Sequence, residues 1–178
     1  MSRARSFEPA LDAGARVLLL GTLPGPASLR EGQYYAHPRN AFWRLIGAVV
    51  GTDLAALPYP DRLATLRRAR VGLWDVIASA VRPGSGDAAI RDAQEADLQA
   101  LLARLPQLRA IGFNGAMAAR IGRRRLGERP GIALVDLPSS SPAYAGMRFE
   151  AKLARWSVLG RFLGSAELVD DLALGDPE

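Results

Sequence analysis

The 178-residue chain contains no cysteine, a single histidine and a single lysine. Without cysteine it cannot form disulfide bonds, use a thiol nucleophile, or hold zinc or an iron–sulfur cluster through thiolates. Because His37 is the only imidazole, the usual histidine sets that bind zinc are missing as well. We therefore expect no metal, no iron–sulfur cluster and no cofactor.

Long apolar stretches are also missing from the chain. No uninterrupted apolar run approaches the roughly 20 residues that a membrane-spanning helix needs. The first fifteen residues contain no long apolar segment followed by a cleavage site, which a secretory signal would show. The sequence therefore predicts a protein of the cytoplasm that has no contact with membranes.

What the chain does contain is a hydrophobic content of 49% and a net charge of +5. This length and composition suit one folded domain with a substantial core. Five of the 18 acidic residues fall in the last 13 positions, where there is no lysine or arginine. We expect a single domain over residues 1–165 and an acidic tail over 166–178. The remaining positive charge suits a polyanionic partner, although an arginine-rich, GC-rich genome would produce the same excess.

Apolar runs and helical periodicity alternate along the chain. Strands are expected at residues 17–20, 71–77, 108–113 and 132–137. Helices are expected at residues 41–50, 61–69, 93–105, 116–125 and 149–163, with a Gly/Pro-rich loop at 81–89. This alternation predicts an α/β fold: a three-layer α/β/α sandwich with a central, mainly parallel four-stranded sheet.

Polar residues follow the end of every predicted strand, in segments that begin at Gly21, Asp75, Asn114 and Pro138. The carboxyl ends of parallel strands lie at one edge of the sheet, where open α/β sheets build their binding sites. The sequence therefore predicts one site, assembled from four separate segments, at this edge.

Three segments carry a specific resemblance: GTLPG at 21–25, YYAHPRNAFW at 34–43 and LPSSSPAYAG at 137–146. Together they resemble the uracil-DNA glycosylase superfamily, and within it the hypoxanthine-DNA (deoxyinosine) glycosylase branch, which is related to the mismatch-specific uracil-DNA glycosylases. The resemblance implies a monomeric, monofunctional enzyme of base-excision repair. Its partner would be DNA containing deaminated bases, from which it would hydrolyse hypoxanthine foremost and leave an abasic site.

Asn40 is the residue that the resemblance identifies as catalytic. Its amide can orient a water molecule, and its dipole can stabilise positive charge that develops on the sugar. The alternative is a structural role, because Asn40 directly precedes a predicted helix and is a favourable capping residue there.

Two positions depart from the pattern that is usual in the superfamily. Leu23 stands where most members carry the aspartate or asparagine that activates water, and Leu137 stands where a histidine or asparagine is usual. The hypoxanthine branch shares these apolar residues. Three other functions stay open: a uracil or mismatch-specific glycosylase, a catalytically silent protein that binds damaged DNA, and an unrelated Rossmann-like enzyme that acts on a small nucleotide. GTLPG lacks the spacing of the glycine motifs that bind phosphate, which disfavours the third.

We expect the base to stack on Tyr35, with Tyr34 in the core. The Asn114 amide could pair with the adjacent N–H and C=O that deamination creates, although Asn-Gly is also a strong turn signal. Backbone groups near Thr22 and the hydroxyls of Ser139 and Ser140 are further candidates for binding the base. The serines could equally form a plain turn.

Contacts to DNA itself are expected from Ser28, Ser141, Tyr144 and Arg148. Tyr144 in particular could insert as a wedge where the base leaves the stack. The densest basic cluster, at 123–125, could contact phosphates or simply be a solvated face.

His37 could assist catalysis or contact phosphate, or simply pack against Trp43 or Tyr35. Asp75, which follows Trp74, could hydrogen-bond and shape its loop or serve as a general base.

Overall fold

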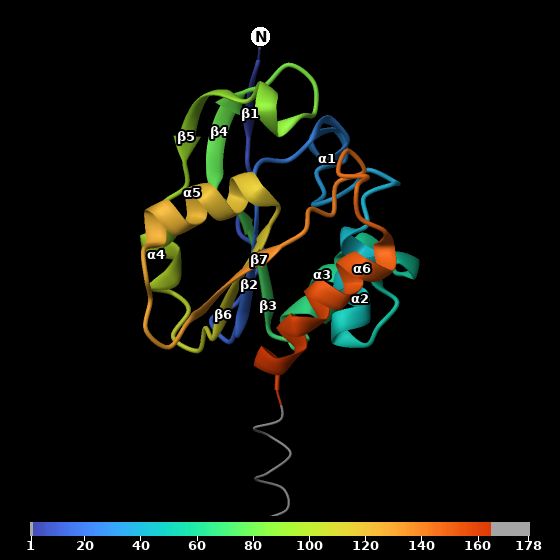
Figure 1. Ribbon diagram of the computed structural model, residues 1–178, viewed down its shortest axis with the longest axis vertical. Helices are drawn as coiled ribbons and strands as arrows, with labels where there is room; N and C mark the ends of the chain where they lie inside the picture. The colour runs from blue at the N-terminus through green and yellow to red at the C-terminus, as the bar shows by residue number, and fades with distance from the viewer. Residues whose placement is uncertain (1, 165–178) are drawn as a thin grey trace, which may run out of the picture.

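The computed structural model describes residues 2–164, and the predicted acidic tail at 166–178 lies outside them. Its central sheet has four parallel strands in the order β3-β2-β6-β7 (Figure 1). The strands are β2 (Val17–Gly21), β3 (Val71–Asp75), β6 (Ala110–Asn114) and β7 (Ala133–Leu137). The two middle strands, β2 and β6, are buried at every position, which explains their continuous apolar sequence. The predicted fold class is confirmed.

Helices cover both faces of this sheet, and each layer closes its own hydrophobic core. In Figure 1, α4 and α5 lie on one side of the strands, and α2, α3 and α6 lie on the other. The α-helices are α1 (Pro26–Glu31), α2 (Phe42–Val50), α3 (Tyr59–Arg68), α4 (Leu98–Leu102), α5 (Ala116–Leu126) and α6 (Phe149–Trp156). Short 3₁₀ helices are η1 (Leu54–Ala56), η2 (Asp87–Ala89) and η3 (Ser157–Phe162).

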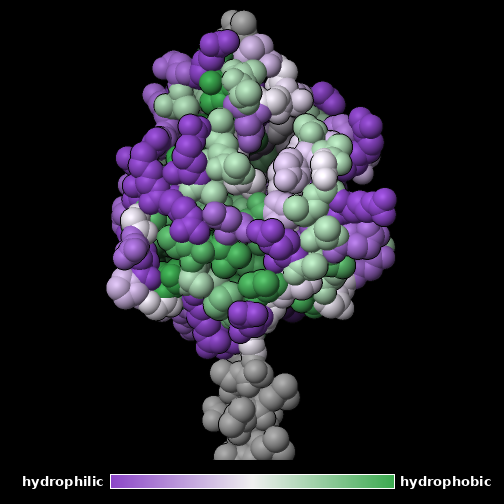
Figure 2. Space-filling model, in the orientation of Figure 1, coloured by the Kyte–Doolittle hydropathy of each residue, from purple (hydrophilic) through white to green (hydrophobic). Residues whose placement is uncertain are grey.

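Strand β7 is an edge of the sheet and is only partly buried over most of its length. Figure 2 shows hydrophilic side chains over α5 and hydrophobic ones gathered below them, over this edge. Among residues 2–164, no helix is both long enough and apolar enough to cross a bilayer.

A second, antiparallel sheet was not predicted. It contains β1 (Arg3–Arg5), β4 (Ile77–Val81) and β5 (Arg91–Glu95), in the order β1-β4-β5. The predicted strand at 71–77 is in fact the end-to-end junction of β3 and β4, where the chain leaves one sheet and enters the other. Strand β4 therefore starts directly after the carboxyl end of β3.

The predicted helix at 93–105 is wrong over its first half, because residues up to Glu95 belong to β5. That strand is mostly exposed and has no apolar alternation, so its sequence resembles a polar helix. Helix α4 begins only at Leu98, after Asp97 accepts a hydrogen bond from the Ala100 N–H at 3.0 Å. The last predicted helix also divides, into α6 and η3.

Helix α5 approaches the sheet closely at Gly122, and this contact generates a testable prediction. A Cβ atom at Gly122 would lie 2.2 Å from Cε1 of Phe113, a fully buried ring of β6. Gly122→Ala should lower the free energy of unfolding by about 1–3 kcal/mol, measured by urea denaturation, although alanine favours helix. The control is Gly160→Ala, because no atom lies within 4 Å of the added carbon there. Equal stability of the two variants would contradict this packing.

Candidate active site

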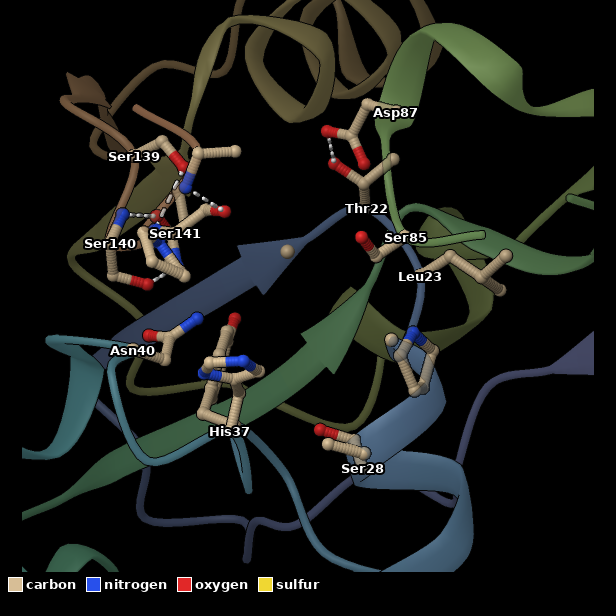
Figure 3. Close-up of a pocket in the computed structure, with 18 of the residues that line it drawn as sticks. Thr22, Leu23, Ser28, His37, Asn40, Ser85, Asp87, Ser139, Ser140 and Ser141 are labelled. Atoms are coloured by element: carbon tan, nitrogen blue, oxygen red, sulfur yellow. Dashed lines mark hydrogen bonds between the residues drawn. The ribbon is translucent and has the colours of Figure 1, made fainter. Parts of the chain in front are cut away.

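A cavity of about 400 Å³ opens at the carboxyl ends of the parallel strands. Its walls come from the segments that follow β2, β3, β6 and β7, so the predicted convergence of four strand ends is observed. In Figure 3, the three serines and Asn40 lie along one wall, with Thr22, Leu23, Ser85 and Asp87 opposite and His37 and Ser28 below. Every residue that the sequence suggested for binding the base lines this cavity: Thr22, Tyr35, Asn114, Ser139 and Ser140.

Ser140 connects three segments of the site and is only 1% exposed. Its N–H donates to Oδ1 of Asn114 at 2.9 Å, and its Oγ accepts from Nδ2 of the same amide at 2.9 Å. Its carbonyl accepts from the N–H of Ala41 at 3.0 Å. These bonds hold the end of β6, the serine loop and the start of α2 in fixed positions.

The Asn114 amide therefore uses one lone pair of Oδ1 and one N–H of Nδ2 in its hydrogen bonds to Ser140. The amide also interacts with the Tyr35 hydroxyl, where it opposes the rise in pKa that burial causes, so the second N–H faces Tyr35 and one further lone pair remains for another partner. The turn alternative is also present, because the next residue, Gly115, has φ +98° and precedes α5. Reading of the base by Asn114 stays a prediction.

Asn40 forms the hydrogen bond that its capping role requires and also lines the cavity, and its catalytic role stays a prediction. Its Oδ1 accepts the N–H of Phe42 at 3.0 Å, which caps the first turn of α2. The same side chain lines the cavity, and Figure 3 shows its amide nitrogen directed toward the interior. Since the oxygen is fixed by the Phe42 N–H, the cap also fixes which way the amide faces.

Tyr35 is held against the floor of the cavity. Its ring stacks on Phe42 with centroids 3.8 Å apart and an interplanar angle of 16°. Its φ of +53° is unusual for a bulky residue and indicates a position fixed by its surroundings. Burial raises the pKa of its hydroxyl, and the nearby Asp75 carboxylate raises it further. Tyr34 is buried in the core, as predicted.

Several hydroxyls of the site are already engaged in hydrogen bonds. Thr22 donates to Asp87 at 3.0 Å, Ser139 accepts the N–H of Ser141 at 3.1 Å, and Ser141 accepts that of Ala143 at 3.2 Å. The serine loop therefore contains the local turn that was the alternative to base binding. Ser28 is buried in the wall, where it accepts the Ala36 N–H at 3.1 Å, so any DNA contact it makes lies inside the cavity.

Of the other residues suggested for DNA contact, Ser141 lines the cavity, whereas Tyr144 and Arg148 do not line it and are exposed. Tyr144 is 46% exposed, and Lys152 donates to its carbonyl at 2.9 Å and lies 5.2 Å from its ring. Arg148 is exposed at the start of α6. The basic cluster at 123–125 is instead paired with acids: Arg123 with Asp136, and Arg124 and Arg125 with Glu95. This pairing favours the solvated-face interpretation of that cluster.

Leu23 and Leu137, which stand where the superfamily usually carries polar residues, are both buried. Leu23 lines the cavity, and Leu137 packs in the core beneath it. Neither supplies a polar group. His37 is exposed at the rim, where its Nδ1 accepts the N–H of Arg39 at 3.1 Å. Within residues 2–164, no group of three or more histidine, aspartate and glutamate side chains could hold a metal ion.

The loop after β4 contributes residues that the sequence did not reveal. Arg82 donates through Nη1 and Nη2 to the carbonyls of Leu23 and Pro24, and Asp87 and Ser85 line the cavity. No local signal marks them, because they reach the site only through the unpredicted second sheet. Asp75, at the end of β3, is 3% exposed, and burial raises its pKa to about 7.

The raised pKa of Asp75 predicts how stability depends on pH. Because the folded protein keeps this proton to a higher pH than the unfolded chain, stability should fall as pH rises from about 4 through 7. Between pH 5 and pH 8 we expect Asp75 to account for a loss of roughly 2–3 kcal/mol. When urea unfolding is measured at pH 5 and at pH 8, the free energy of unfolding of Asp75→Asn should not show this loss. An identical loss in the variant would contradict the assignment.

Comparison with known proteins agrees with this architecture. The sequence profile of the Uracil DNA glycosylase superfamily matches residues 8–160. A hypoxanthine DNA glycosylase of Methanosarcina acetivorans is 41% identical over 139 residues, which are 78% of this chain and 87% of that protein. A hypoxanthine DNA glycosylase of Methanosarcina barkeri is 41% identical over 113 residues, 64% of this chain and 72% of that protein.

A solved structure is similar as well. It is the solution NMR structure of a Methanosarcina acetivorans protein proposed to be a uracil DNA glycosylase, with 37% identity and a TM-score of 0.81. The similarity covers 91% of this chain and 99% of that one. On the profile match and these relatives together, the chain belongs to the uracil DNA glycosylase superfamily.

Proposed function

We propose that this protein is a DNA glycosylase that removes hypoxanthine from DNA by hydrolysing the bond between the base and C1′ of deoxyinosine. The proposal is supported most directly by the cavity, where the Asn40 amide is held in a fixed orientation opposite polar residues at the strand ends. Leucine also occupies positions 23 and 137, where most members of the superfamily carry polar residues. The two Methanosarcina relatives are named for hypoxanthine excision, which supports the same substrate. DNA with deaminated bases is then the partner; the monomeric state and cytoplasmic location stay predictions from the sequence.

The reaction requires the nucleotide to leave the duplex and enter the cavity. In the proposed complex the base stacks on Tyr35, whose position is supported from behind by Phe42. Tyr144, exposed and held by Lys152, would fill the space that the base leaves in the stack. Arg148 would contact the backbone nearby.

Asn40 would position the attacking water. One lone pair of its Oδ1 is occupied by the Phe42 N–H, and the amide nitrogen, which faces the interior of the cavity, can donate a hydrogen bond to a water molecule and hold the water oxygen near C1′. An amide is too weak a base to remove the proton at neutral pH. Its contribution is to hold the water in position for attack.

The test of the proposed function is excision from labelled duplexes that contain deoxyinosine, deoxyxanthosine or deoxyuridine, with alkali to cleave the abasic sites. Deoxyinosine should react fastest. Asn40→Ala should reduce its single-turnover rate about 10²–10³-fold, because the oriented water is lost. Cleavage led by deoxyuridine would favour the uracil alternative, and binding of damaged DNA without cleavage would favour the silent one.

A matched variant separates the two roles of Asn40. Asn40→Ser keeps a side-chain oxygen that can cap α2 but has no amide. It should retain near-normal stability, measured by thermal unfolding, and still lose excision to the same extent as Asn40→Ala. A normal rate in Asn40→Ser would mean that Asn40 is only a helix cap.

Selection of the base supplies a separate prediction. The N–H of Asn114 that faces Tyr35 and its remaining lone pair match the O6 and N1–H of hypoxanthine, whereas adenine presents the reverse pattern. Asn114→Asp keeps an acceptor for the Ser140 N–H and loses the donor to O6. Its excision of hypoxanthine relative to adenine should fall at least about tenfold. Ser140→Ala measures the effect of breaking the link alone, and an unchanged ratio in Asn114→Asp would exclude base reading by this amide.

A further inference from the structure

Asp75 is the one acidic side chain that is buried and also forms part of the cavity wall among residues 2–164. Its Oδ2 accepts a hydrogen bond from Oγ of Ser6 at 2.7 Å. Its Oδ1 accepts no hydrogen bond from the part of the chain that the structure describes. Oδ1 is not among the fully buried side-chain atoms that lack a partner in residues 2–164, so it is open to the cavity and to a molecule bound there.

The space in front of Oδ1 exists because residue 21 is glycine. Gly21 of β2 is the register partner of Asp75 on β3. A Cβ atom at Gly21 would lie 2.8 Å from Oδ1 of Asp75 and 2.6 Å from the hydroxyl oxygen of Tyr35. The missing side chain therefore leaves the carboxyl and the phenol of Tyr35 side by side at the floor of the cavity, where the base is proposed to lie.

The polar, charged and titratable groups around Asp75 come from three segments. Arg82 and Asp87 approach from the loop after β4, the Tyr35 and Tyr34 hydroxyls from the loop after α1, and the Ser6 hydroxyl from the segment after β1. Burial raises the pKa to about 7 and Asp87 raises it further, while Ser6 and Arg82 lower it. At neutral pH the carboxyl is thus poised to hold or release a proton.

A purine that leaves through N9 takes the electron pair of the broken bond, and protonation of its ring makes it a better leaving group. The two positions where polar groups are usual in the superfamily are leucine here, so they offer the base no proton. The other acid in the cavity, Asp87, is exposed and accepts the Thr22 hydroxyl at 3.0 Å. His37 is exposed at the rim and its Nδ1 accepts a backbone N–H.

We propose that Asp75 is the general acid of the reaction, donating its carboxyl proton to a ring nitrogen of the departing purine. As the C1′–N9 bond breaks, its electron pair passes to the base, which leaves neutral after accepting the proton. The water held by Asn40 forms the new bond to C1′ and releases a proton to solvent. The Asp75 carboxylate then regains a proton from solvent. This inference rests on the proposed function.

The test is the single-turnover rate on a deoxyinosine duplex between pH 5.5 and pH 9. For the wild-type protein we expect a plateau at low pH and a fall of about tenfold per pH unit above about 7, as the carboxyl loses its proton. Asp75→Asn should be at least about 100-fold slower at pH 6 and should lack this fall. Thermal unfolding and duplex binding show whether the variant is folded.

Two neighbouring substitutions give signatures that a structural role of Asp75 would not produce. Ser6→Ala removes a hydrogen bond that lowers the pKa, so the fall in rate should move to higher pH. Asp87→Asn removes a charge that raises it, so the fall should move to lower pH. These shifts also decide the question if Asp75→Asn does not fold.

The outcomes separate the two proposals. A wild-type rate on deoxyinosine that does not change with pH overturns the role of Asp75 and leaves the proposed function standing. So does an Asp75→Asn rate within threefold of wild type, or a fall in rate that stays at the same pH in both neighbouring variants. If the wild-type protein excises no hypoxanthine at any pH, the proposed function itself fails, and the role of Asp75 fails with it.

Discussion

The paired hydrogen bonds between Asn114 and Ser140 are the constraint on which the site depends. They join the end of a central strand to a loop that follows the edge strand, and the Ser140 carbonyl then holds Ala41 at the entrance to α2. Asn40 directly precedes Ala41, so this hydrogen bond also fixes the position of Asn40. A site made of loops is thereby fixed to the most rigid part of the fold, the ends of buried parallel strands.

The change of sheet at Val76 has equal importance for the chemistry. By ending β3 at Asp75 and starting β4 two residues later, the chain buries a carboxyl beneath the cavity and sends the next loop across its mouth. Arg82 secures that loop to the turn after β2 by donating to the carbonyls of Leu23 and Pro24. Leu23 therefore has two roles: its backbone carbonyl anchors the loop after β4, and its apolar side chain forms part of the cavity wall.

Most of the central architecture could be predicted from the sequence, because buried parallel strands are short, apolar and bounded by glycine or polar residues. Val17–Gly21 and Ala110–Asn114 are examples. The second sheet could not, since Arg91–Glu95 is polar and exposed, and its pairing with β4 depends on contacts distant in sequence. For the same reason the sequence does not identify Asp87 and Arg82 as residues of the site. The convergence of Asn40, Tyr35 and Asn114 was predictable from strand ends, whereas the bonds of Ser140 required the structure.

The loop after β4 belongs to the small sheet, while Asn40, Asn114 and Ser140 belong to the large one. Residues 82–90 can therefore change in length or sequence without disturbing the strands that hold Asn114 and Ser140. Over evolution, such a division lets the shape of the cavity and the surroundings of Asp75 diverge among relatives while the strand ends that hold Asn40 and Asn114 in place stay the same. For protein engineering it identifies this segment as the place to begin when a glycosylase for a different damaged base is wanted.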